Sequence, residues 1–298
     1  MIVSLAAGSV TNVIGRVVAE RMREPLGQPI VIENVTGADG AIGLGRAARA
    51  RPDGYTIDFG FIDPHVFNGA LYSLPYDVLN DFAPISPVVA APLVLYARKT
   101  MPANDLNELI RWLNANPNKA SLGYNAPGPH VVAALFQKES QTHFTLVPYR
   151  NVAVQDLIAG QIDLMFDALH QLPLVRAGNI KALAVTSDTR WALAPDIPTF
   201  RELGLPTVVY TAWGGFFAPK GTPKGIIAKL NGAAVQALAD NVVRSRLVDL
   251  GEEIFPRERQ TPEELGALVK ADAEKWWPII KEFGIKGPAG IAVPTRLE

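Results

Sequence analysis

Cysteine is absent from the 298-residue chain, which excludes disulfides, thiolate catalysis and zinc–cysteine sites. Histidine is scarce as well. The four histidines are His65, His130, His143 and His170, and no two of them are spaced like a pair of metal ligands on one helix. Neither HExxH nor a G-x-S-x-G elbow occurs. The sequence therefore predicts no metal site, no cofactor and no catalytic constellation.

An excess of charge is also missing. Lys and Arg number 28 and Asp and Glu 29, giving a net charge of −1 without any run of one sign. A nucleic-acid partner is not expected, because such proteins carry a basic footprint. No stretch approaches the about 18 apolar residues of a membrane-spanning helix. Met1 leads directly into Ile2–Leu5 without a basic segment, so we expect a cytosolic chain or a mature form without a signal peptide.

What the chain does have is an ordinary globular composition, 48% hydrophobic and 19% charged, in which apolar strands alternate with helical periodicity. This alternation predicts an α/β fold with mostly parallel sheets flanked by helices. We expect strands near 2–5, 29–32, 55–60, 85–90, 93–97, 121–124, 144–148, 162–166, 181–185 and 208–217. We expect helices near 13–26, 40–50, 64–72, 104–114, 129–140, 152–159, 169–177, 198–203, 223–239, 241–250 and 262–283.

Two extended segments have an unusual composition. Val88–Tyr96 is interrupted by Pro92, and Tyr210–Ala218 contains Gly214-Gly215. Both are good candidates for crossings between two lobes. We therefore predict one lobe from residues 1–95 and 219–298 and a second from 96–218, with hinges near 88–98 and 210–219. This is the layout of a hinged periplasmic binding protein.

The turn between the first strand and the first helix is the best candidate for a ligand site. Its small residues leave backbone N–H groups uncovered at a helix N-terminus, where anions bind. Ser9, Thr11 and Asn12 can cap the helix or donate to a ligand. The carboxyl ends of strands in open α/β sheets are where ligands bind. The candidate contacts in this turn are Ala7, Gly8, Ser9, Thr11 and Asn12.

Later strand ends supply further candidates. The turn before a helix at Pro129 offers Asn125, Ala126, Gly128 and His130. Arg150, followed by Asn151, is the only basic residue at these strand ends, and a guanidinium binds a carboxylate through two donors. A surface salt bridge is the alternative for Arg150. Phe61 and Asp63 follow a strand, and Asp167 follows another, where it serves as a helix N-cap or a ligand contact.

Two motifs suggest enzymes but fit poorly. Gly40–Gly45 lies within a helical pattern and lacks the glycine order of a dinucleotide fingerprint, so helix packing is the better interpretation. Asp58, Asp63 and His65 could serve an enzyme on this fold, but the sequence does not place the two carboxylates face to face.

A series of short motifs in order resembles the Bug-type receptors of tripartite tricarboxylate transporters over essentially the whole chain. The motifs include Ala6-Ala7-Gly8, Leu26-Gly27-Gln28-Pro29, Pro52-Asp53-Gly54-Tyr55, Leu74-Pro75-Tyr76-Asp77, Val147-Pro148-Tyr149-Arg150, Gly160-Gln161-Ile162-Asp163 and Pro219-Lys220-Gly221-Thr222-Pro223. Each motif alone is weak, and their order and spacing together are specific.

The resemblance implies a two-lobed type II periplasmic binding protein that closes on a small carboxylate and delivers it to membrane transporter subunits. It implies a monomer, a periplasmic location and no covalent chemistry. Family members hold the carboxylate through backbone N–H groups, hydroxyls and waters, and the matching turns are Ala6–Asn12, Asn125–His130 and Arg150.

Several positions depart from the family pattern. The family usually has glycine where Ser9 stands, aspartate where Asn12 stands and glycine where Asn151 stands, and the turn before Pro129 is shorter here. Two alternatives to a transport receptor stay open: a sensing module that feeds a signalling partner, and an enzyme on the same fold.

Overall fold

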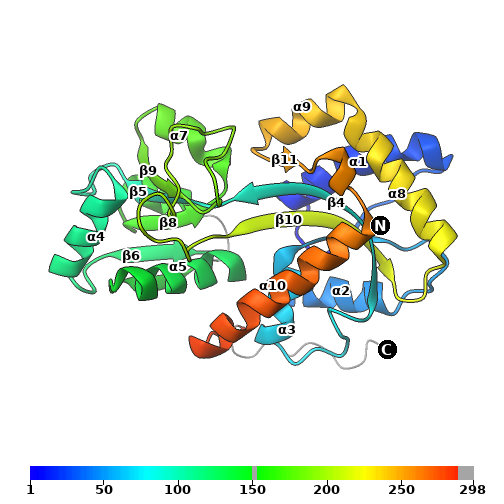
Figure 1. Cartoon of the computed structure of the whole chain (residues 1–298), viewed down its shortest axis with the longest axis horizontal. Coiled ribbons are helices and arrows are strands. Elements are labelled where there is room, and N and C mark those ends of the chain that lie inside the picture. Colours follow the sequence, from blue (N-terminus) through cyan, green and yellow to red (C-terminus); the bar gives the residue numbers. More distant parts are fainter. Residues whose placement is uncertain (150–152, 288–298) are drawn as a thin grey trace. The chain divides into compact units, whose positions relative to one another are not determined.

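The computed structural model describes residues 1–149 and 153–287. The chain divides into two compact units. Unit 1 comprises Met1–Ala90 and the chain from Trp213 onward, and unit 2 comprises Ala91–Ala212. The first division lies within strand β4 (Phe82–Pro92) and the second within strand β10 (Thr211–Pro219), so these two strands carry the chain between the units (Figure 1).

Unit 1 is built on a sheet with strand order β11-β4-β10-β3-β1-β2. Its remaining strands are β1 (Ile2–Val3), β2 (Glu33–Asn34), β3 (Asp58–Phe61) and β11 (Glu253–Ile254). β1 pairs in parallel with both β2 and β3, whereas β10 pairs antiparallel with β3 and β11 antiparallel with β4. The helices of this unit are α1 (Val10–Leu26), α2 (Ala41–Ala48), α3 (Asn68–Leu71), α8 (Lys224–Ala239), α9 (Asn241–Asp249) and α10 (Pro262–Glu282).

The first helix shows how local signals and packing combine. The Ser9 side chain accepts a hydrogen bond from the amide of Asn12, and Gly27 ends α1 in the left-handed conformation. Buried residues of α1 pack against the sheet and against α8 in one apolar core. Gly15 is required by this packing, because a Cβ there would lie 2.9 Å from the Phe59 ring.

Unit 2 has its own sheet, with strand order β7-β6-β8-β5-β9. The strands are β5 (Val94–Arg98), β6 (Ser121–Tyr124), β7 (Thr145–Pro148), β8 (Leu164–Asp167) and β9 (Ile180–Val185). β6 pairs in parallel with β7 and β8, and β5 pairs antiparallel with β8 and β9. The helices are α4 (Leu106–Ala115), α5 (Pro127–Ser140), α6 (Val154–Ala159) and α7 (Leu172–Arg176).

The structure corrects three expectations. The sheets are mixed rather than mostly parallel. In unit 1, β10 is antiparallel to β3 and β11 to β4, and in unit 2, β5 is antiparallel to β8 and β9. The strand expected at 29–32 is only Glu33–Asn34, since its partner β1 begins at Ile2, which lies opposite Glu33. The helix expected at 198–203 is a series of turns, in which Thr199 instead forms a bridge with Val185.

None of the helices in the described ranges is both long and apolar enough to cross a membrane.

Candidate functional site

The parallel strands of unit 1 bring two candidate turns to one edge of its sheet. β1 and β3 are parallel neighbours, so their carboxyl ends lie side by side. The turn from Ala6 to Ser9 follows β1, and Phe61 and Asp63 end β3 and begin the π-helix Asp63–Phe67. The candidates Ala7–Asn12 and Phe61–Asp63, which were named from the sequence, therefore follow neighbouring strand ends of unit 1.

The N-terminus of α1 still has two unused donors. The amide of Ser9 donates to Ala6 O at 3.2 Å, and the amide of Asn12 donates to Ser9 Oγ at 3.2 Å. The amides of Val10 and Thr11 have no hydrogen bond to any part of the chain that the structure describes. They are the first two amides of the helix, where the positive end of the helix dipole favours an anion.

Asn12 adds a buried donor to these amides. Its side chain is only 2% exposed. Its Oδ1 accepts from the amide of Gly8 at 3.3 Å and from Nε of Arg16 at 3.0 Å. Its Nδ2 has no hydrogen-bond partner among residues 1–149 and 153–287. An unsatisfied buried donor is costly, so this corner of unit 1 is suited to a ligand that accepts hydrogen bonds.

Gly8 is needed for backbone conformation. Its φ is +84°, and no atom lies within 4 Å of the position that a Cβ would take. A β-branched residue would strain this left-handed turn although there is space for its side chain.

Two of the three residues considered for an enzyme, Asp58 and His65, are enclosed. Nε2 of His65 lies 2.8 Å from Oδ2 of Asp58, and the two side chains are 0% and 1% exposed. The His65 ring stacks on Phe217, with ring centroids 3.8 Å apart. The pair is therefore part of the core of unit 1 and does not reach a surface where a substrate could meet it.

Unit 2 has an equivalent edge. β7, β6 and β8 are parallel neighbours, so their carboxyl ends also lie together. β6 leads into Asn125, which is exposed, and Ala126 precedes α5. Because α5 begins Pro127-Gly128-Pro129, the amide of Gly128 is the only donor of its first three positions. This helix N-terminus thus offers an anion fewer donors than that of α1.

His130 lies in the first turn of α5 and stacks on Tyr124, with ring centroids 4.2 Å apart. Burial lowers the pKa of His130 and raises the pKa of Tyr124. His130 is therefore neutral at pH 7 and offers a ligand a hydrogen bond rather than a positive charge.

We expect the stability of the chain to fall as the pH drops through the ordinary pKa of histidine. Because the pKa of His130 is lowered in the folded chain, His130 stays neutral there at pH values where the unfolded chain already binds a proton. Protonation therefore favours unfolding. His130→Phe keeps the ring contact and should reduce this pH dependence. Urea unfolding between pH 5 and 8 measures it. An unchanged dependence in His130→Phe would show that other groups cause it, and His143→Phe is the matched control.

Of the three remaining candidates of unit 2, the structure describes only Asp167. Asp167 ends β8 and accepts from the amide of Ala168 at 2.9 Å and from Nε2 of Gln171 at 2.8 Å. Its carboxylate is thus already used locally, like that of a capping residue. Arg150 and Asn151 lie outside the described residues.

Over the described part of the chain, no group of three His, Cys, Asp or Glu side chains is placed to hold a metal ion.

Comparison with known proteins decides the family. The profile of the family described as "Tripartite tricarboxylate transporter family receptor" matches residues 14–285. The chain belongs to this family. Among the relatives of this receptor, BugT of Bordetella pertussis is 32% identical over 293 residues, which covers 96% of this chain and 89% of BugT.

Solved structures agree with the assignment. MatC from Rhodopseudomonas palustris, solved with bound malate, is 35% identical with a TM-score of 0.83, covering 94% of this chain and 97% of that one. An R. palustris protein solved with adipate is 30% identical with a TM-score of 0.85, covering 96% and 97%. The periplasmic binding protein BugD is 34% identical with a TM-score of 0.83, covering 96% and 97%. The two mixed sheets flanked by helices are the fold of periplasmic binding proteins, and the chain is a solute-binding receptor of the tripartite transporter family.

Sequence reasoning missed two parts of the site. It did not name Val10, whose amide is unused like that of Thr11, and it did not recognise that the Gly8 amide is already bonded to Asn12 Oδ1. Recognising Ser9 as the cap would have identified Val10 and Thr11 as the first helical residues. It also missed the stacking of Tyr124 on His130, which no local pattern reveals.

Proposed function

We propose that this receptor captures a small organic acid, of the dicarboxylate class, outside the cytoplasm and delivers it to the membrane subunits of its transporter. Two relatives of the same fold hold malate and adipate, which are both dicarboxylates. The receptor acts in the periplasm as a monomer and performs no covalent chemistry. The enclosed position of Asp58 and His65 supports the absence of chemistry, because neither can reach a substrate.

The observation that carries this proposal is the group of free donors at the start of α1. The amides of Val10 and Thr11 and the buried Nδ2 of Asn12 all lack an acceptor within the described chain. One carboxylate has two oxygens with lone pairs for several such donors. In our proposal the first carboxylate of the ligand binds there, and Gly128 and His130 stay candidate ligand contacts within unit 2.

Native mass spectrometry of the purified protein, followed by a thermal-shift screen of C4 to C6 dicarboxylates, tests the function. We expect at least one dicarboxylate to raise the melting temperature in a concentration-dependent way, because a ligand that binds only the folded state stabilises it. Its recovery unchanged after incubation is expected of a receptor. Turnover of the acid, or stabilisation only by uncharged solutes, would contradict the proposal.

We expect Arg150→Ala to lower the affinity for the best dicarboxylate about tenfold. A guanidinium that binds a carboxylate through two donors contributes on the order of 1.5–3 kcal/mol, of which solvent screening removes part. Arg150→Lys should restore only part of the loss, because an ammonium lacks the planar pair of donors. Calorimetric titration measures both. Unchanged affinity in both variants would mean that Arg150 is a surface residue and that amides and Asn12 hold the acid.

A further inference from the structure

Two asparagine side chains hold the turn between β1 and α1, and they come from different elements. Asn34, the last residue of β2, donates from Nδ2 to Leu5 O at 2.9 Å. Asn12, in the first turn of α1, accepts from the amide of Gly8 at 3.3 Å. The segment from Leu5 to Gly8 is therefore held at both ends by side-chain amides.

Arg16 joins these two asparagines. Its Nε donates to Asn12 Oδ1 at 3.0 Å, and its Nη2 donates to Asn34 Oδ1 at 3.4 Å. Residues four apart lie on the same face of a helix, so Arg16 reaches Asn12 along the surface of α1. Arg16 therefore connects the N-terminal turn of α1 to the end of β2.

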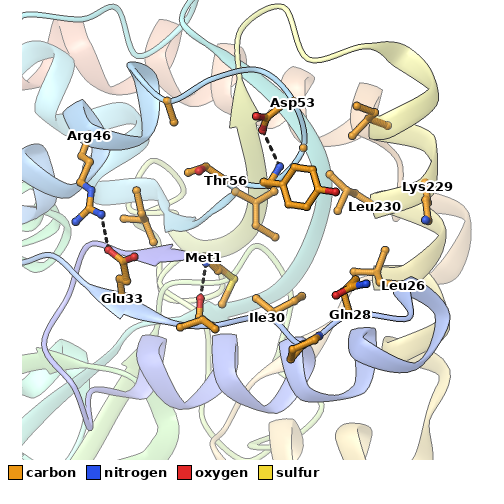
Figure 2. A pocket seen from close by; sticks show the side chains of 18 of the residues that line it. Met1, Leu26, Gln28, Ile30, Glu33, Arg46, Asp53, Thr56, Lys229 and Leu230 are labelled. Atoms are coloured by element: carbon orange, nitrogen blue, oxygen red, sulfur yellow. Dashed lines mark hydrogen bonds and ion pairs between the residues drawn. The ribbon is translucent and has the colours of Figure 1, made fainter.

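The opposite face of β2 is occupied by an ion pair. Side chains alternate between the two faces of a strand, so Glu33 points away from its neighbour Asn34. Figure 2 shows Glu33 turned toward Arg46 of α2, with 2.5 Å between Glu33 Oε2 and Arg46 Nη2. Arg46 thus meets a carboxylate, whereas the two contacts of Arg16 are to neutral amide oxygens. The contacts of Arg16 fix orientation rather than neutralise a charge.

The chemistry of a guanidinium decides how the Asn12 side chain is turned. A guanidinium has N–H donors and no acceptor, and a backbone N–H is likewise only a donor. The Asn12 atom that meets both Arg16 and the amide of Gly8 is therefore the carbonyl oxygen. The other end of the side-chain amide, Nδ2, is left on the remaining side, where it has no partner in the described chain.

We propose that Arg16 is a positioning residue for the acid, which fixes the orientation of Asn12 and, together with Asn34, the shape of the turn. This inference rests on the proposed function, in which Nδ2 of Asn12 donates to a ligand carboxylate. If Asn12 were turned the other way, its Oδ1 would face the carboxylate, and two acceptors repel each other. In this arrangement Arg16 acts through Asn12 and does not itself contact the acid.

The test compares Arg16→Gln with Arg16→Met, with the dicarboxylates succinate, glutarate and adipate as probes. Nε2 of glutamine is separated from the backbone by the same number of bonds as Nε of arginine, so it still donates to Asn12 Oδ1, whereas methionine places a methyl group there. The two variants lose the same charge, so long-range attraction of the acid does not separate them. We expect Arg16→Met to lower the affinity about tenfold and Arg16→Gln to stay within about threefold of the original chain, because a misdirected donor to a charged group costs roughly this much. Calorimetric titration measures both.

Arg23→Met is the matched control, because it removes another exposed arginine of α1, whose ion pair with Glu20 at 3.5 Å is also exposed. It should leave the affinity unchanged. Arg16→Met should also cost clearly less in an Asn12→Ala background, because Arg16 then has no amide to orient. Equal affinities of Arg16→Gln and Arg16→Met, or equal losses from Arg16→Met with and without Asn12, would overturn the inference and leave the proposed function standing. No binding of any C4 to C6 dicarboxylate by the original chain would overturn the proposed function and, with it, this inference.

The two faces of β2 supply an independent comparison. Asn34→Ala removes the bond to Leu5 O and one of the two contacts of Arg16, and it should lower the affinity about three- to tenfold. Glu33→Gln removes the charge pair on the opposite face and should leave the affinity unchanged. The melting temperature of each variant without ligand separates a loss of affinity from a loss of folding. Equal affinities of Asn34→Ala and Glu33→Gln would refute the role of Asn34 in shaping the turn.

Discussion

Val10→Pro should weaken binding of the organic acid ten- to hundredfold while leaving α1 folded. Val10 is the first residue of α1, and its amide has no acceptor within the described residues. Proline is favoured at the first position of a helix, since it removes only an N–H that the helix does not use. Ser9 has φ −63° and ψ 155°, the conformation that a following proline demands.

The expected loss follows from the ligand's charge. A hydrogen bond from an amide to a carboxylate contributes about 1.5–3 kcal/mol, which corresponds to roughly ten- to hundredfold in affinity. Calorimetric titration with the best dicarboxylate measures the loss, and circular dichroism checks the fold. Val10→Ala is the matched control, because it shortens the side chain but keeps the amide. Equal affinity of the proline and alanine variants would place the carboxylate away from this helix.

Glu252→Gln should stabilise the chain at alkaline pH by several kcal/mol. Glu252 follows the end of α9, where Gly251 has φ +82° and the amide of Glu252 donates to Leu247 O at 3.1 Å. This is the Schellman arrangement, which turns the second residue past the helix end back onto the helix, at a position usually occupied by an apolar side chain. The Glu252 side chain is accordingly buried, at 4% exposure, and burial raises its pKa to about 8.

The sign of the effect follows from proton linkage. Between the ordinary pKa of a glutamate, about 4.3, and about 8, the folded state keeps a proton that the unfolded chain has released. The contribution of Glu252 to the free energy of unfolding is therefore fully present below about pH 4.3. It declines as the pH rises from there to about 8, by about 1.4 kcal/mol per pH unit. The difference between the variant and the original chain should be about 1 kcal/mol at pH 5 and reach on the order of 5 kcal/mol at pH 9.

Urea unfolding at pH 5, 7 and 9 measures this difference. The matched control is Glu253→Gln, which removes the same charge from the next residue, whose side chain is exposed. We expect the control to differ little from the original chain at every pH. A constant difference between Glu252→Gln and the original chain from pH 5 to pH 9 would show that the Glu252 carboxyl titrates normally.

The local elements were predictable where a chemical signal marks their ends. Ser9 and Gly27 bound α1 as a cap and a left-handed terminator, and the expected helix ended at that glycine. Helix periodicity was equally reliable for α8, α9 and α10, since their buried faces recur at regular spacing. The failure at 198–203 has a different origin, because short apolar segments satisfy either a helix or a packed turn, and the bridge from Thr199 to Val185 stabilises the turn.

The candidate site was only partly predictable. The expected strand ends marked the turns after β1, β3, β6 and β8, and parallel pairing brings these turns to one edge in each unit. Which atoms in a turn are free to bind was not predictable. That depends on internal hydrogen bonds, such as the one that occupies the Gly8 amide and orients Asn12.

The sequence by itself determined the alternation of strands and helices, the capping of individual helices and, through the order of its motifs, the receptor family. These features depend on residues close together in the chain or on a pattern along it. Only the tertiary structure decided which polar groups are enclosed and which are left without a partner. His65 was a possible catalytic residue in the sequence, but in the structure it is enclosed with Asp58 and stacks on Phe217. The unpaired donor of Asn12 and the raised pKa of Glu252 both result from burial of these side chains. Burial results from packing over the whole unit, so no short stretch of sequence determines it.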